Sequence, residues 1–75
     1  MDILIYKGML GRERFLCNLG TTEEYTIPHT NDLISIGEGE NATVYRVLAT
    51  LFDYAKYDYD SQNEINVFVE ELEDW

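Results

Sequence analysis

Residues 42–57 read ATVYRVLATLFDYAKY, and this stretch decides which fold the sequence predicts. Its apolar side chains recur at i, i+3, i+4, i+7 and i+11, the spacing that gathers side chains on one side of a helix. The residues at those positions are Val44, Val47, Leu48, Leu51 and Ala55. Asn41 is a suitable N-cap, and Glu38 and Glu40 lie near the positive end of the helix dipole. We therefore predict an amphipathic helix over residues 42–57.

Short segments that favour strands lie on both sides of this predicted helix. Residues 2–7 and 13–19 are rich in branched and aromatic side chains, and Gly8 and Gly11 between them allow a tight hairpin. Three further segments have the composition of strands: residues 25–27, 33–36 and 65–72. The first two of these flank turn-like residues, which predicts a second, weaker hairpin. The order β-β-(β-β)-α-β predicts one α+β domain over residues 1–75, a small antiparallel sheet with one amphipathic helix packed on one face.

The predicted sheet has apolar side chains on both faces, whereas one helix covers a single face. We expect the covered face to contain Ile3, Ile5, Phe15, Cys17, Ile65, Val67 and Val69. The opposite face then exposes Leu4, Tyr6, Leu16 and Phe68, and exposed apolar patches of this kind mark association sites. Two outcomes stay open: a second copy of the chain covers these residues as a homodimer, or residues 20–36 fold over them.

The charge of the chain is strongly negative and unevenly distributed. Fifteen acidic residues against five basic ones give a net charge of −10. Residues 1–20 contain two acids and three bases, whereas residues 21–75 contain thirteen acids and two bases. A surface of this charge repels nucleic acid and anionic membranes and attracts basic proteins. We therefore expect a basic protein as the partner, and no direct contact with nucleic acid or membrane.

The carboxyl-terminal third concentrates this charge and mixes it with aromatic residues. Carboxylates held on a rigid strand imitate part of the phosphate array of a nucleic acid, and aromatic side chains are favoured contact residues in interfaces. We predict that the partner contacts Asp53, Tyr57, Asp58, Tyr59, Asp60, Glu64, Phe68, Glu70, Glu71 and Glu73. A simpler explanation of the same residues is that charge keeps a small domain with exposed apolar surface in solution.

No group of residues predicts catalysis, a cofactor or a metal site. Cys17 is the only cysteine and has apolar neighbours, and nothing in the sequence places the only histidine, His29, beside it. The segment after the predicted helix matches a calcium-binding loop at Asp58 and Asp60, but it lacks the glycine and the final glutamate of that loop. We predict a protein that is not an enzyme and that binds neither cofactor nor metal.

The expected location follows from three features of the sequence. The chain has one cysteine, no apolar run of about 20 residues, and no basic start or small-residue cleavage site at its first residues. One free thiol is typical of a reducing compartment. Together these features favour a cytoplasmic protein, in the host cytoplasm if the chain is viral.

In size, acidity and aromatic content the chain is similar to small virus-encoded inhibitors that imitate DNA. The similarity is one of composition, so no functional residue carries over from it. Our leading hypothesis is an inhibitor or adaptor that occupies the basic site of a nucleic-acid-binding protein. Two alternatives stay open: an accessory or structural protein that assembles through the apolar sheet face, and an antitoxin or immunity protein.

Overall fold

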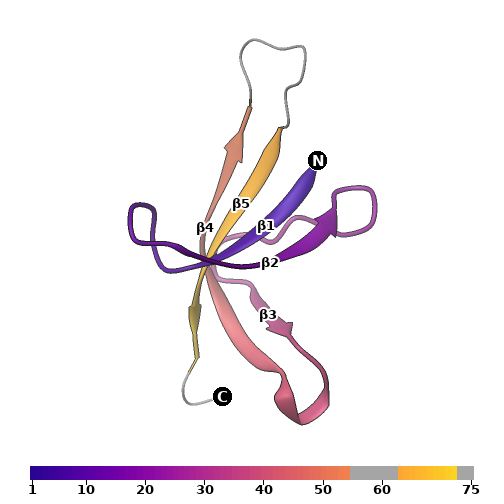
Figure 1. The fold of residues 1–75 in the computed structure, drawn as a ribbon, viewed down its shortest axis with the longest axis vertical. Coiled ribbons are helices and arrows are strands. Elements are labelled where there is room, and N and C mark those ends of the chain that lie inside the picture. Colours follow the sequence, from indigo (N-terminus) through magenta and orange to yellow (C-terminus); the bar gives the residue numbers. More distant parts are fainter. Residues whose placement is uncertain (55–62, 73–75) are drawn as a thin grey trace.

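The computed structural model describes residues 1–54 and 63–72, and more than half of them belong to one curled sheet (Figure 1). Its strands are β1 (Asp2–Lys7), β2 (Arg14–Thr21), β3 (Leu33–Ile36), β4 (Thr43–Asp53) and β5 (Glu64–Glu71). They lie in the order β2-β1-β5-β4-β3. β1 and β5 run parallel, and the other neighbouring strands run antiparallel. The result is a mixed five-stranded half-barrel.

The α+β prediction is wrong, because most of the predicted helix is the longest strand. β4 occupies Thr43–Asp53, and the only helical element among the described residues is a 3-10 turn, η1 (Gly39–Asn41). Six of the 11 residues of β4 are threonine, valine, tyrosine or phenylalanine. β-branched and aromatic side chains favour extended backbone. Residues 55–57, the end of the predicted helix, lie outside the described residues.

A β-bulge in β4 changes which of its residues share a face. Val47 opposes Val69 and Ala49 opposes Phe68, so Leu48 is one extra residue in β4. One extra residue exchanges the two faces for every residue that follows it. Val47 shares a face with Val69, whereas Val44 and Leu51 lie on the opposite face, so the four residues of the predicted stripe within β4 do not lie together. The helical spacing arose because apolar residues occupy both faces of β4.

The weaker predicted hairpin is also wrong. Residues 25–27 form no strand, and β3 pairs with β4 instead. The segment before β3 is held against β4 by backbone and side-chain hydrogen bonds. The Asn31 amide donates to the Val47 carbonyl at 2.8 Å, and the Thr50 hydroxyl donates to the Pro28 carbonyl at 2.7 Å. These bonds bring Ile27 against the core.

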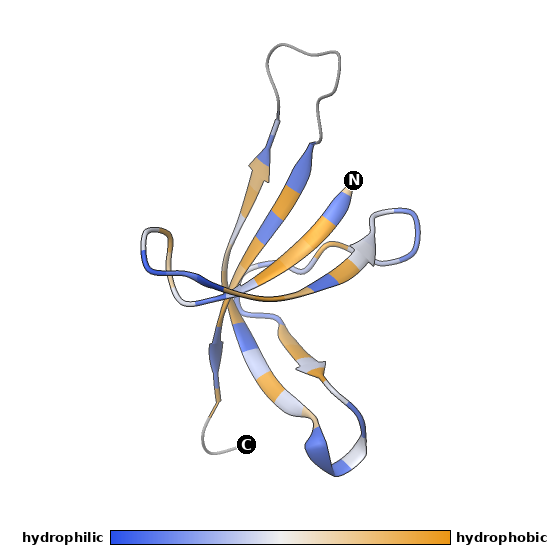
Figure 2. Cartoon of the chain, viewed as in Figure 1, coloured by the Kyte–Doolittle hydropathy of each residue, from blue (hydrophilic) through white to orange (hydrophobic). Residues whose placement is uncertain are grey.

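The core lies on one face of the sheet, which we call the inner face. Its fully buried side chains come from the three central strands and are Ile3, Ile5, Val47, Ile65, Val67 and Val69. Burying each of them contributes about 1.5–3 kcal/mol. Partly buried residues pack around this cluster, namely Leu16, Cys17, Leu19, Ile27, Ile34, Ile36 and Tyr45. Figure 2 shows the apolar run of β1 and the alternation of apolar and polar residues along β5.

The curl of the sheet covers the inner face, which we had expected a helix to cover. Sheets twist because of the chirality of their strands, and the bulges increase that twist. The edge strands and the segment before β3 thereby come to pack against the central cluster. Within residues 1–54 and 63–72 there is no helix long and apolar enough to cross a membrane.

Candidate functional site

The outer face of the sheet carries a set of side chains, all apolar or aromatic except Asn66, that span four strands. The pairing register places Phe15, Tyr6, Phe68 and Ala49 side by side on β2, β1, β5 and β4. Leu4, Asn66 and Leu51 form the next row on the same face. We call these seven residues the outer patch. It contains three of the four predicted assembly residues, Leu4, Tyr6 and Phe68.

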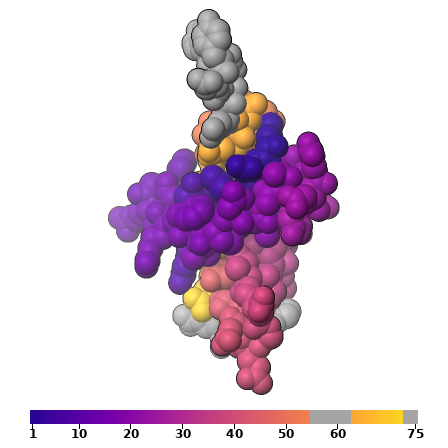
Figure 3. All heavy atoms as spheres, turned by 45° about the vertical axis from the view of Figure 1, so that its right-hand side comes forward, coloured from indigo at the N-terminus to yellow at the C-terminus, as the bar shows by residue number. Residues whose placement is uncertain are grey.

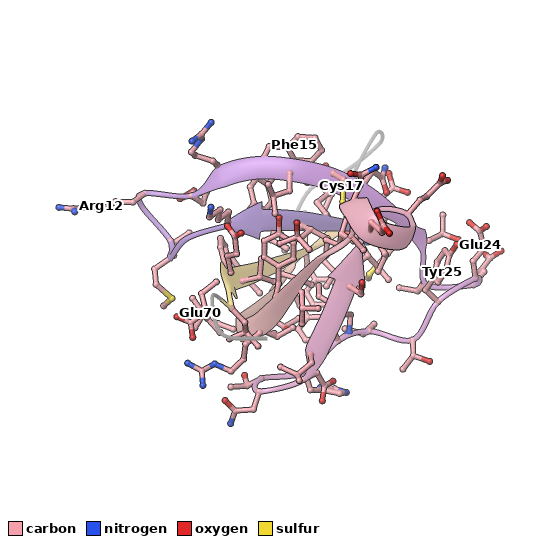
Figure 4. All side chains as sticks on the ribbon, turned by 90° about the horizontal axis from the view of Figure 1, so that it is seen from below. Arg12, Phe15, Cys17, Glu24, Tyr25 and Glu70 are labelled. Carbon is pink, nitrogen blue, oxygen red and sulfur yellow. The ribbon has the colours of Figure 1, made fainter. Side chains whose placement is uncertain are left out.

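The fourth predicted assembly residue, Leu16, lies elsewhere because of a second bulge. Cys17 opposes Ile5 and Phe15 opposes Tyr6, so Leu16 is an extra residue in β2. Leu16 packs against the core, and Phe15 joins the outer patch in its place. Figure 4 shows Phe15 projecting from the outer side of β2. Simple alternation, without a bulge, assigns Phe15 to the inner face and Leu16 to the outer face.

Three aromatic rings give the outer patch a defined shape. The ring centroids of Tyr6 and Phe15 are 5.6 Å apart with the planes at 68°, and those of Tyr6 and Phe68 are 5.8 Å apart at 28°. Each such pair contributes about 0.5–1.5 kcal/mol beyond the area it buries. Phe68 retains 4% of its surface exposed, whereas Phe15 retains 58% and Leu51 41%. The patch thus has a packed centre and exposed apolar side chains on both flanks.

Three carboxylates lie in register beside the outer patch. Asp2 of β1 opposes Glu64 of β5, and Glu64 also opposes Asp53 of β4. We call these three residues the acid row. Neighbouring strands are about 4.8 Å apart, so the row spans about 10 Å on the outer face. Within residues 1–54 and 63–72 its carboxylates make no ion pair and no hydrogen bond.

The acid row presents concentrated charge and is not a metal centre. Among the described residues, no three acidic, histidine or cysteine side chains converge in a way that could hold a metal ion. Like charges directly opposite one another in a sheet repel and cost stability. A cationic group from another molecule relieves that repulsion, so the row favours a basic ligand.

Two other predicted partner residues are already paired within the chain. Lys7 Nζ donates to Glu71 Oε2 at 3.1 Å, and the Arg46 guanidinium pairs with the Glu70 carboxylate. These ion pairs are about half exposed, so each contributes at most about 1 kcal/mol. They nevertheless neutralise the acids at the far end of β5.

The structure thus divides the ten predicted partner-binding residues into three groups. Asp53 and Glu64 belong to the acid row, and Phe68 belongs to the outer patch next to it. Glu70 and Glu71 are paired with bases. The other five, Tyr57, Asp58, Tyr59, Asp60 and Glu73, lie outside the described residues. Asp2 was missed, because it joins the row only through the parallel pairing of β1 with β5.

The two edges of the sheet are poorly suited to pairing with another strand. β2 contains two bulges, since Leu19 is an extra residue in addition to Leu16. β3 has only four residues. Bulged and very short edge strands are two of the ways in which proteins prevent strand addition. Both edge strands therefore resist the addition of another strand.

Cys17 belongs to the core and not to a catalytic group. Its side chain packs against the buried cluster of the inner face. Burial raises the pKa of the Cys17 thiol, so the protonated form is favoured at neutral pH. Reactive cysteines have the opposite property, a lowered pKa.

Comparison of the chain with protein-family models, curated protein sequences and solved structures found no match. The function proposed below therefore rests on the acid row and the outer patch.

Proposed function

We propose that the chain is a protein-binding domain, an inhibitor or adaptor, that binds a basic surface of a partner protein with its outer face. One observation carries the proposal: three carboxylates that make no ion pair among the described residues, those of Asp2, Glu64 and Asp53, adjoin an aromatic patch on the same face. In this proposal the chain acts by binding and not by catalysis.

The acid row and the outer patch have different roles in such a complex. Charges act over about 10 Å at ordinary salt, so the acid row steers and orients a basic partner. The exposed side chains of Phe15 and Leu51 supply apolar area that leaves water on contact, which stabilises the complex. Tyr6 and Phe68 hold the centre of the patch in place, so little conformational entropy is lost on binding.

The partner that fits best is a nucleic-acid-binding protein. A duplex presents one charge per strand for about every 3.4 Å of its axis, and carboxylates on adjacent strands are about 4.8 Å apart. A groove whose lysines and arginines neutralise phosphates therefore meets a similar charge density on the acid row. The cytoplasmic location, expected from the lone thiol, is part of the same proposal. A viral origin is supported by similarity of composition alone.

The experiment is a capture from cell extract with two matched variants. The first neutralises the acid row (Asp2→Asn, Asp53→Asn, Glu64→Gln). The second neutralises three exposed acids elsewhere, Glu23→Gln, Glu38→Gln and Glu40→Gln, and so changes the net charge equally. We expect wild type and the second variant to retain basic nucleic-acid-binding proteins at about 50 mM salt and to lose them near 200 mM. The first variant should retain none. Equal capture by both variants would show that net charge, and not the acid row, selects the partner.

A second candidate function is supported by the exposure of Phe15 and Leu51. An accessory or structural protein would use the outer patch for assembly and the acids for solubility. Capture would then persist at about 200 mM salt, because apolar contacts are insensitive to screening. An antitoxin or immunity protein would show the salt dependence of the first candidate, and the identity of the captured protein would distinguish it.

A further inference from the structure

The unpaired arginines of the described chain lie together at one end of the sheet. Lys7 and Arg46 are in ion pairs, whereas Arg12 and Arg14 make none within residues 1–54 and 63–72. Both belong to the turn between β1 and β2 or to the first position of β2. Two large apolar side chains of the same turn, Met9 and Leu10, are 54% and 65% exposed. We call Met9, Leu10, Arg12 and Arg14 the basic tip.

The backbone of the basic tip is held in a defined shape. The Gly8 amide donates to the Val69 carbonyl at 2.9 Å, and the Arg12 amide donates to the Met9 carbonyl at 2.9 Å. The Gly11 amide donates to the Glu13 carboxylate at 2.7 Å. Gly8 and Gly11 have φ values of +103° and +100°, which other residues rarely adopt. The turn extends to one side of the sheet in Figure 1, and Arg12 points away from the sheet in Figure 4.

The basic tip and the acid row lie at opposite ends of β1. Asp2 begins the strand and belongs to the acid row, whereas the basic tip follows Lys7 at its other end. Five residue steps along a strand correspond to about 17 Å. The outer patch lies between, on the same strands. Figure 3 shows the indigo and purple β1–β2 region as a band across the middle of the molecule. The chain therefore has a positive end, an apolar middle and a negative end.

We propose that a second copy of this chain covers the outer face, packed antiparallel about a two-fold axis through the outer patch. In that arrangement the basic tip of each copy lies on the acid row of the other, and the two patches meet in the middle. A two-fold axis forms both charged contacts at once, because residue i meets residue j and j meets i. The inference rests on the proposed function, in which a basic partner docks on the outer face. When no such partner is present, a second copy of the chain occupies that face.

The arrangement accounts for three features that are otherwise unrelated. An acidic chain keeps two unpaired arginines beside two exposed apolar side chains. Three carboxylates oppose one another on adjacent strands and make no ion pair within residues 1–54 and 63–72. The aromatic side chain of Phe15 stays exposed on a face whose centre is packed. A basic partner and a second copy compete for the same acid row, so partner binding converts the dimer into monomers.

The experiment uses two variants, each of which reverses the charges at one end of the outer face. A tip variant carries Arg12→Glu and Arg14→Glu, and a row variant carries Asp53→Lys and Glu64→Lys. Sedimentation equilibrium and native mass spectrometry at about 50 mM salt report the mass of each and of their equimolar mixture. We expect wild type to be a dimer. Each variant alone brings like charges together at both contacts, which should weaken dimerisation at least about a hundredfold.

The mixture is the decisive sample. A heterodimer of the tip and row variants has one native contact and one with both charges reversed, so both contacts are attractive. We expect a 1:1 heterodimer of near wild-type affinity, and its formation also shows that both variants fold. A control variant, Glu38→Lys with Glu40→Lys, has the charge change of the row variant away from the outer face and should dimerise like wild type.

Three results would overturn the proposal. The first is a wild type that stays monomeric at every concentration, and the second is a variant homodimer as stable as the wild-type dimer. The third is a mass that grows beyond two copies as concentration rises, which indicates head-to-tail assembly.

Failure of the dimer is distinguishable from failure of the proposed function. A monomeric chain that still captures basic proteins through the acid row contradicts only the dimer, and a dimer that captures none contradicts only the proposed function.

Discussion

On its inner face the sheet removes Ile3, Ile5 and Val67 from solvent completely, whereas on its outer face Phe15 and Leu51 remain 58% and 41% exposed. The two faces are built from alternate residues of the same strands, and both are rich in apolar side chains. The difference comes from the curl, which brings β2, β3 and the segment before β3 around one face only. The inner face therefore holds the fully buried core, and the outer face leaves large apolar side chains exposed.

The largest expected effect is a difference in stability between substitutions at two neighbouring residues of β1, one on each face. Ile5→Ala removes a fully buried side chain from the inner cluster and should lower the free energy of unfolding by about 2–5 kcal/mol. Leu4→Ala acts on the partly buried outer row and should cost less than half as much. Urea denaturation of both variants measures the two values. Equal losses would show that the outer face is covered as completely as the inner one.

The next prediction separates stability from binding within the outer patch. Phe15 is exposed and contacts Tyr6 edge-on, so Phe15→Ala should lower the free energy of unfolding by about 1 kcal/mol or less. The same change should weaken dimerisation or partner capture at least about tenfold, because the exposed ring of Phe15 supplies apolar area that is buried on contact. Denaturation and sedimentation of one sample measure both. A variant that loses stability but binds normally would contradict the assignment of the patch.

Prediction from the sequence succeeded where the signals were local. The positions of β1, β3 and β5 and the first turn follow from alternation and from Gly8 and Gly11, because neighbouring residues alone determine them. The identity of β4 could not be obtained in this way. Apolar residues lie on both faces of the strand, so their spacing matches that of a helix, and the bulge at Leu48 has no reliable signature in one sequence. The β-branched and aromatic composition of β4 is a better indicator of its structure than the apolar spacing.

Most of the candidate site depends on contacts between distant segments. Asp53 and Glu64 were predicted as partner residues from charge and aromatic density, but Asp2 was not. Their alignment requires β5 to pair with β1 on one side and with β4 on the other, which places residues from both ends of the chain in register. The exchange of Phe15 for Leu16 likewise requires the bulge in β2. Alternation assigns a face only while the pairing has no extra residue.

A smaller difference in stability is expected between substitutions of acids at the two ends of the outer face. Glu64→Gln removes the central charge of the acid row and should raise the free energy of unfolding by about 0.2–1 kcal/mol at low salt, because like charges directly opposite are destabilising. Glu70→Gln breaks the pair with Arg46 and should lower it by about 1 kcal/mol or less. Both differences should shrink in about 1 M salt, where screening is nearly complete. A loss of stability in Glu64→Gln would mean that the row is structural. A gain supports a row that is kept for binding in spite of its cost.

The smallest expected effect is a pH-dependent change in stability caused by the thiol of Cys17, at the border of the inner face. Burial raises the pKa of this thiol above its ordinary value of 9.0, so the folded state holds the proton more tightly than the unfolded state does. The resulting stability is fully present below the unfolded pKa and is lost as pH rises through the folded pKa. Wild type should therefore lose more free energy of unfolding between about pH 7 and about pH 10 than Cys17→Ala. Both proteins share every other titrating group, so the difference between them isolates the thiol. Urea denaturation under reducing conditions at the two pH values measures it. If the two proteins lose equal stability, the Cys17 thiol faces solvent and the inner face is not covered as far as β2. If wild type loses more, the thiol is buried and β2 forms part of the half-barrel that encloses the core.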